Sequence, residues 1–232
     1  MRIKLAFFLA LFLIDSLFAQ NRPFEVGVSI MPLISNNLLT AKSSALPDIV
    51  KLYQDNETNL FGFAMNAVVR KPITNKISMQ SGFGFSLEGN DTKKRNVNWA
   101  SPDPSLPIAI KLQYIHYNLN IPVLINYHFS VFKRPFYVQT GLVGVYNFKR
   151  ISKAISYFSS KSSVTTVSED NLDIRRINLS TSLGLGMDII NKAGYKVFIQ
   201  PNFDINLFSI HQEAPISRRL YNFGLIMGVL FR

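Results

Sequence analysis

Connections of two lengths alternate along this chain. Eight runs in which apolar residues alternate with small or polar ones are joined in turn by a long polar segment and by a short turn. The long segments lie at about residues 33–59, 89–107, 149–172 and 209–219, and the short turns at about 71–75, 132–134 and 191–194. Runs of about ten residues match a tilted strand that crosses a bilayer. The pattern therefore predicts an all-β fold, an eight-stranded antiparallel transmembrane β-barrel with long extracellular loops, short periplasmic turns and both termini in the periplasm.

The two faces of these runs differ in size as well as in polarity. In residues 176–189, Ile177 and Leu183 lie on one face, and Asn178 and Gly184 lie on the other. A soluble barrel of the lipocalin type would place the bulky face inside, where eight strands of Phe, Leu and Met would overfill a small lumen. Aromatic residues also gather at both ends of the runs, as they do at the two interfaces of a membrane. We therefore expect the bulky face to contact lipid and the polar face to line the lumen.

The alternation is interrupted at three places. Ile110 has the opposite parity to Leu119 in the fourth run. Either a bulge near Tyr114–Ile115 resets the register, or the upstream stretch stands above the membrane. Pro122 and Pro201 each remove a backbone donor from the middle of a run, so we expect them to mark bulges or local register breaks.

The first 19 residues have the features of a secretory signal peptide. Arg2 and Lys4 provide a basic start, Leu5–Ile14 is an apolar core too short to span a bilayer as a helix, and small residues precede a cut after Ala19. The alternative is an N-terminal membrane anchor. We expect residues 1–19 to be the signal peptide and residues 20–232 to form the barrel domain.

Charge and cysteine usage exclude several classes of function. The formal net charge is +11, but the Lys and Arg residues fall mostly in the expected loops and no nucleic-acid recognition motif is present, so no nucleic-acid partner is predicted. The chain has no cysteine, which removes disulfides, a thiol nucleophile and Cys-based zinc sites. No motif indicates a cofactor or a metal. Outer-membrane lipid and lipopolysaccharide are the predicted surroundings.

One run resembles a known family. Tyr117–Tyr127, YNLNIPVLINY, resembles the YLEIPLLLKY-type strand of PorT-like outer-membrane β-barrels from the Bacteroidetes, and the runs FGFAMNAVV, SGFGFSLEG, LGLGMDI and FIQPNFDI are similar to the same family. Asn120 stands where that family often has Glu, and Asn126 where it often has Lys. The resemblance covers essentially the whole mature chain and implies an outer-membrane location. One branch of the family assists protein secretion.

Three charged residues are predicted to meet in the lumen. By parity Glu25, Arg70 and Arg232 all point inward, and all lie at the turn end of adjacent strands. A carboxylate between two guanidinium groups would pair charges that are costly to bury alone. Such a cluster indicates either a structural plug at the closure of the barrel or, as the sharper alternative, a gated ion path.

A second candidate set lies at the opposite end. Arg175, Arg176, Arg218 and Arg219 fall at the bases of the outer loops, at the height of lipopolysaccharide phosphates, which Arg binds well. They form either a lipopolysaccharide-contacting collar or an ordinary solvated surface.

The histidines give a weaker signal for chemistry. His116 or His211 beside Asp173 or Ser209 could form a nucleophile-activating pair, but no spacing requires it, and no catalytic or metal-binding residue is predicted. We therefore expect a non-enzymatic outer-membrane protein with a structural or interaction role through its extracellular loops. The alternatives are an accessory factor in protein secretion, with envelope or secretion proteins as partners, and a narrow porin-like channel.

Overall fold

The structure, a computed structural model, describes residues 24–42, 47–101, 103, 105–131, 134–169, 174–211 and 214–232. The expected signal peptide, residues 1–19, lies outside the described residues. The described residues form ten strands and one helix: β1 (Glu25–Ala41), α2 (Pro47–Asn56), β2 (Glu57–Pro72), β3 (Ile77–Thr92), β4 (Arg95–Asn96), β5 (Ala109–Val131), β6 (Arg134–Tyr157), β7 (Val164–Glu169), β8 (Ile177–Asn191), β9 (Tyr195–Asn206) and β10 (Ile216–Phe231).

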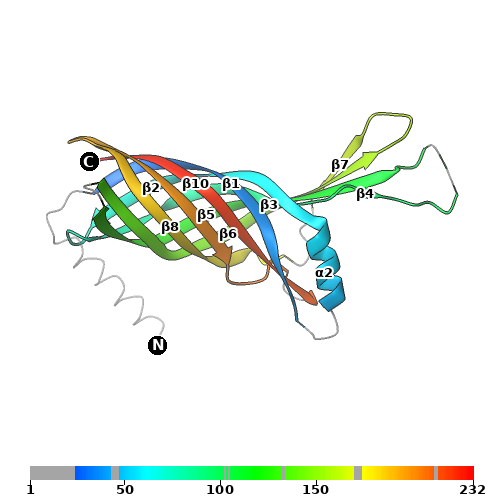
Figure 1. The fold of residues 1–232 in the computed structure, drawn as a ribbon, viewed down its shortest axis with the longest axis horizontal. Helices are drawn as coiled ribbons and strands as arrows, with labels where there is room; N and C mark the ends of the chain where they lie inside the picture. Colours follow the sequence, from blue (N-terminus) through cyan, green and yellow to red (C-terminus); the bar gives the residue numbers. More distant parts are fainter. Residues whose placement is uncertain are drawn as a thin grey trace.

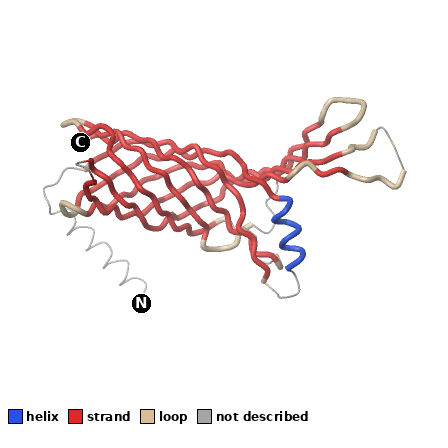
Figure 2. The backbone as a smooth tube through the Cα atoms, in the orientation of Figure 1, coloured by secondary structure: helices blue, strands red, loops and turns tan. Residues whose placement is uncertain are grey.

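Eight of the strands close into a ring (Figures 1 and 2). Each pairs antiparallel with its neighbours in the order β5-β3-β2-β1-β10-β9-β8-β6, and β6 pairs back onto β5. The first and last strands meet along their whole length, from Val26 opposite Phe231 to Ala41 opposite Ile216. The predicted eight-stranded antiparallel barrel is confirmed, and β4 and β7 are short additions outside the ring.

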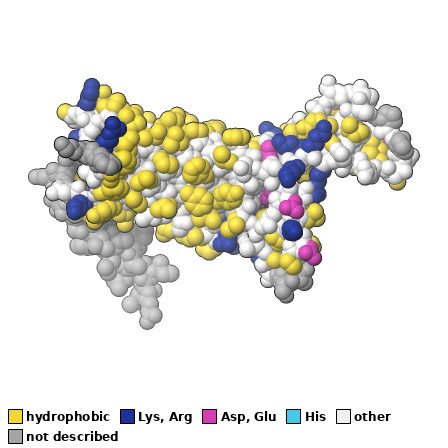
Figure 3. Space-filling view, viewed as in Figure 1, with side chains coloured by type: hydrophobic (Ala, Val, Ile, Leu, Met, Phe, Trp, Pro, Cys, Tyr) yellow, Lys and Arg dark blue, Asp and Glu magenta, His cyan; other side chains and the backbone are white. Residues whose placement is uncertain are grey.

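Alternation along the strands separates an apolar outer face from a lumen. Val26, Val28 and Ile30 are exposed, with Val28 at 62%, while Gly27 and Ser29 between them are buried. Figure 3 shows the middle of the barrel covered with apolar side chains, and the charged side chains gathered toward its two ends. An apolar band with charges only beyond its edges is the surface that a bilayer requires. None of the described helices is long and apolar enough to cross a membrane.

The strands are longer than predicted at the end opposite the termini. β1 continues to Ala41, within the segment 33–59 that was predicted to be a loop, and α2 occupies much of the remainder. β5 and β6 stay paired from Tyr117 opposite Lys149 up to Ala109 opposite Tyr157, with β7 beside them. The connections at this end are long, as predicted, but the strand ends were predicted too early, because strand pairing continues above the band, where no lipid enforces an apolar outer face.

The register breaks also differ from those predicted. Pairing runs unshifted past Pro122 opposite Val143 and past Pro201 opposite Leu225, so neither proline marks a shift. Between β5 and β6 the register shifts at Tyr117/Asn118, where Phe148 is the extra residue on β6. Each of the two explanations for the parity change holds in part. The upstream part of β5 rises beyond the apolar band, and a bulge is present, but it lies on β6 and not on β5.

Candidate functional site

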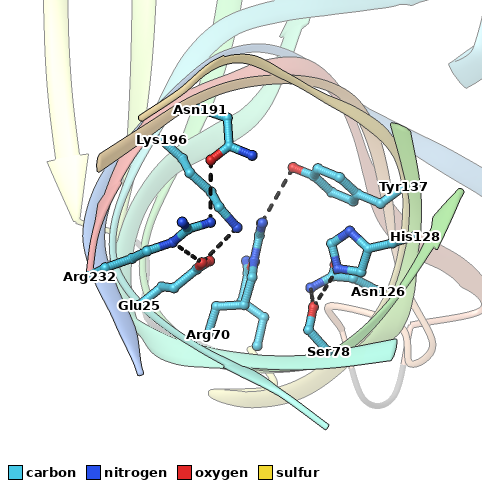
Figure 4. A network of polar contacts seen from close by, with 10 residues as sticks. Glu25, Arg70, Ser78, Asn126, His128, Tyr137, Asn191, Lys196 and Arg232 are labelled. Atoms are coloured by element: carbon cyan, nitrogen blue, oxygen red, sulfur yellow. Dashed lines mark hydrogen bonds and ion pairs between the residues drawn. The ribbon is translucent and has the colours of Figure 1, made fainter. Parts of the chain in front are cut away.

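An ion-pair cluster lies at the turn end of the lumen (Figure 4). Lys196 Nζ lies 2.6 Å from Glu25 Oε1, and Arg232 Nε donates to the same oxygen at 3.0 Å. Arg232 also donates to Asn191 Oδ1 at 3.3 Å. The cluster therefore joins β1, β9 and β10 across the seam where the two ends of the chain meet.

Arg70 lies opposite Glu25 in the β1–β2 register, but its hydrogen bonds go elsewhere. Its Nε and Nη2 donate to Gln80 Oε1 at 3.1 and 2.8 Å. The guanidinium carbon stands 4.8 Å from the centre of the Tyr137 ring and 5.3 Å from that of Phe198. At 1% exposure Arg70 is a fully buried cation held between two aromatic faces, an arrangement that offsets part of its desolvation.

The structure thus brings Glu25 and Arg232 into direct contact and places Arg70 beside them, toward the lumen centre. Lys196, which contacts the carboxylate most closely, was not among the predicted residues. Its parity offered the signal, because Lys196 shares the inward face of β9 with Gln200 and Asn202.

A chain of amides crosses the lumen above this cluster. Asn126 donates to Ser78 Oγ at 3.1 Å, Gln139 donates to Asn126 Oδ1 at 2.7 Å, and Gln200 donates to Gln139 Oε1 at 2.7 Å. Gln200 also donates to Asn202 Oδ1 at 3.0 Å. These buried amides satisfy one another, which removes the cost of burying polar groups in a narrow barrel.

Rings and aliphatic side chains fill the lumen beside these amides. Tyr137, Phe198 and Leu230 pack together with almost no exposure. Two glycines make room for the rings: a Cβ at Gly186 would lie 2.0 Å from Cζ of Tyr137, and one at Gly228 would lie 2.5 Å from the Phe198 ring. The small residues of the inner face therefore serve to admit large ones from neighbouring strands.

Cavity volumes follow this packing. A space of about 560 Å³ at the turn end is lined by Glu25, Arg70 and Lys196, and the space in the middle of the barrel has only about 80 Å³. Nearer the mouth, Glu88 accepts hydrogen bonds from Asn118 and Asn222, and the space there has about 20 Å³. Sequence reasoning did not select Glu88, although its parity places it inward. The lumen is thus filled at two levels.

A cavity of about 940 Å³ opens at the mouth, the end with the long connections. We call it the mouth cavity. Its walls come from most of the elements that reach the mouth, including α2, β2, β4, β5, β6 and β10. Its lining mixes apolar side chains such as Leu52 and Leu112 with charged ones such as Glu57, Arg150 and Arg218.

The four predicted arginines do not form one set. Arg218 points into the mouth cavity, where it forms an ion pair with Glu57 and lies 4.7 Å from the Tyr53 ring. Arg175 lies over the Phe208 ring at 5.2 Å, and Arg176 is exposed. Arg219 shares the parity of the outward residues of β10, and within the described chain its buried Nε has no hydrogen-bond partner.

Of the three histidines, His116 and His211 both line the mouth cavity, and His128 lies at the opposite end of the barrel. His128 is hydrogen-bonded to Ser78 at 2.8 Å near the turn end, whereas His116 lies 3.5 Å from Asn147 near the mouth. Ser209 Oγ accepts a bond from the Arg218 backbone, and Asp173 lies outside the described residues. In the part of the chain that the structure describes, no group of three or more acidic or histidine side chains is placed to hold a metal.

Comparison with known proteins agrees with this architecture. A family model described as "Outer membrane protein beta-barrel domain" matches residues 18–212. The chain belongs to this family. The protein is therefore an outer-membrane barrel, and by the usual orientation of such barrels the short turns and the termini face the periplasm and the mouth cavity faces outward. No curated protein sequence matches the chain.

Among solved structures, Neisserial surface protein A aligns over 90% of this chain and 96% of its own, at 12% identity and a TM-score of 0.39. Ail, the attachment invasion locus protein of Yersinia pestis, aligns over 89% and 98%, at 13% identity and a TM-score of 0.37. The translocator domain of the autotransporter NalP from Neisseria meningitidis aligns over 94% and 91%, at 10% identity and 0.37.

The seam cluster makes a prediction about stability. In Glu25→Ala, Lys196 and Arg232 lose their shared carboxylate inside the barrel, so we expect the free energy of unfolding to fall by about 3 kcal/mol. Urea titration of the refolded outer-membrane barrel in lipid vesicles measures this. The matched control is Glu169→Ala. Glu169 accepts a hydrogen bond from the exposed Lys149 and attracts its charge, which raises the pKa of Lys149, but water screens that pair. Equal losses in the two variants would contradict a structural role for the seam cluster.

Proposed function

We propose that this protein is a closed, non-enzymatic outer-membrane barrel that acts by binding partners with the structured region above the membrane. The observation that carries the proposal is a contrast between the two parts of the barrel. Its lumen is filled by Arg70, Tyr137 and Phe198 at one level. At another level it is filled by Glu88 with Asn118 and Asn222, which we call the Glu88 layer. Its strands, however, continue past the apolar band into an extension of ordered backbone (Figure 1). We also propose that residues 1–19 are the cleaved signal peptide and that residues 20–232 form the barrel domain.

The extension is built as a surface for contact. β5, β6 and β7 form a sheet in which every residue of β7 is exposed. Its outer strand is held by backbone pairing from Ile151 opposite Glu169 to Ser156 opposite Val164. Exposed sheet edges of this kind accept extended segments of other proteins. Ordering so many residues outside the membrane serves no need of the barrel itself, which supports a role in recognition.

A closed lumen predicts that the protein does not conduct ions. We expect no current steps from the refolded protein in a planar bilayer, and none from Arg70→Ala or Glu88→Ala alone, because each variant keeps the other layer. A large porin in the same membrane is the positive control, and a band that shifts on boiling in a semi-native gel shows that each sample is folded. Stepwise conductance from the folded wild-type protein would favour the narrow-channel alternative and overturn the closed barrel.

The second candidate function is an accessory role in protein secretion. It is supported by the resemblance of Tyr117–Tyr127 to the PorT-like strand. Asn126, where that family often has Lys, belongs to the amide chain across the lumen and is fully buried. We expect a deletion strain to secrete less cargo protein if the role is the PorT-like one, measured by comparing the extracellular protein fractions of the two strains. If the deletion strain secretes as much cargo as the parent strain but no longer binds an external partner, the secretion role is excluded and the first proposal is supported.

Lipopolysaccharide is the third element of the proposal, and Arg176 and Arg219 are the residues best placed for it. Arg176 is exposed, and Arg219, which is partly exposed, has the outward parity of β10. Arg218 is directed into the mouth cavity and is less suited to the collar.

We expect the double variant Arg176→Gln, Arg219→Gln to lose most of the rise in unfolding temperature that lipopolysaccharide gives the wild-type barrel, because two phosphate-binding forks are removed. Thermal unfolding with and without lipopolysaccharide measures this rise. Arg134→Gln, an exposed change at the periplasmic end, is the matched control. If both variants keep the full rise, the collar hypothesis fails.

A further inference from the structure

The helix α2 carries two apolar surfaces, and only one of them is packed. Val50 is buried against Leu39 and Ile216, which fixes the helix to β1 and β10. Ile49, Leu52 and Tyr53 follow helical spacing and are all exposed, with Leu52 at 55%. All three line the mouth cavity. A helix needs one apolar stripe to dock, so the second stripe requires a separate explanation.

A second apolar surface of the mouth cavity comes from β5. Ile110, Leu112 and Tyr114 are alternate residues of this strand, and all three line the cavity and are only partly covered. Two apolar walls from separate elements therefore border a single space of about 940 Å³. Cavities of roughly 300–1,000 Å³ are typical of sites for small molecules.

The charged groups of the mouth cavity are mainly positive. Among the described residues that line it, Arg95, Arg150 and Arg218 provide three guanidinium groups against the single carboxylate of Glu57. Glu57 is paired with Arg218, and Arg95 donates through Nε to Asn56 Oδ1 at 2.7 Å. The Tyr53 ring lies beneath the Arg218 guanidinium and so joins the apolar wall to the basic region.

We propose that the mouth cavity is a binding site for a small anionic amphiphile, a molecule with a carboxylate or phosphate head and an apolar body. The two apolar walls would cover the body, and the excess of guanidinium groups would attract the head. The cavity opens above the apolar band, so the ligand is one that reaches the protein from the external water. This inference rests on the proposed function, because it identifies one partner class of the extension.

Binding can be followed through Trp99, the only tryptophan of the chain, which directly follows the lining residue Asn98. The full-length protein, refolded into discs of zwitterionic lipid, is titrated with omega-bromooctanoate, whose bromine quenches indole fluorescence. We expect saturable quenching. The trimethylammonium analogue with the same chain should bind much more weakly, because the cavity carries excess positive charge. Quenching that rises linearly without saturation, or equal affinity for the two probes, would overturn the proposal.

Two variants locate the site. Leu52→Asp places a carboxylate on the apolar wall, and we expect the dissociation constant to rise about tenfold or more. Val167→Asp is the matched control, since Val167 has the same 55% exposure but lies on β7, outside the lining. Unchanged binding in Leu52→Asp would overturn the assignment. If both variants still shift on boiling in a semi-native gel and neither conducts, a failure of ligand binding would leave the closed barrel standing.

Discussion

The antiparallel pairing of β1 with β10 is the interaction on which the rest of this molecule depends. Inside a bilayer no water is available to the backbone, so a sheet with open edges would leave a row of unsatisfied N–H and C=O groups at several kcal/mol each. Pairing the first strand with the last removes both edges at once. It also brings the two ends of the barrel together, which places Glu25 and Arg232 at one seam and lets a single carboxylate hold cations from two other strands.

Closure with eight strands then dictates what the lumen can contain. A barrel of this size has an interior that side chains can fill, and every polar group placed there must find its partner within it. The chain arranges these polar groups in layers: an ion-pair cluster at the periplasmic end, amides that bond to one another beside packed rings, and Glu88 with Asn118 and Asn222 nearer the mouth. Gly186 and Gly228 show how the layers fit, because each admits a ring from the adjacent strand.

The parts of this structure that the sequence predicts are those that the bilayer constrains. Lipid on one side and a filled lumen on the other enforce a period of two, so the number of strands, their direction and the inward parity of Glu25, Arg70 and Arg232 could all be derived. Lys196 obeys the same parity, yet its contact with Glu25 depends on the β9–β10 register, which parity alone does not give. Above the membrane the constraint ends. In the upper part of β5 the alternation continues with a changed parity, and α2 has only one buried residue, Val50, so the sequence pattern did not give the length of the strand or the presence of the helix.

The same loss of constraint supports the proposal that recognition takes place at the mouth and not on the wall of the barrel. Within the membrane band a side chain is limited by lipid, by its cross-strand neighbours and by the crowded lumen, so few positions can change without affecting the fold. The walls of the mouth cavity meet none of these limits: Leu52 and Tyr53 lie on the open side of α2, and the docking of that helix is left to Val50 on its other side. In this proposal, one face of α2 serves stability and the other serves recognition. Apolar side chains that stay exposed to water do not affect the packing of the barrel below them, but they lower the solubility of the protein. An exposed apolar surface of this kind is expected where a ligand covers it.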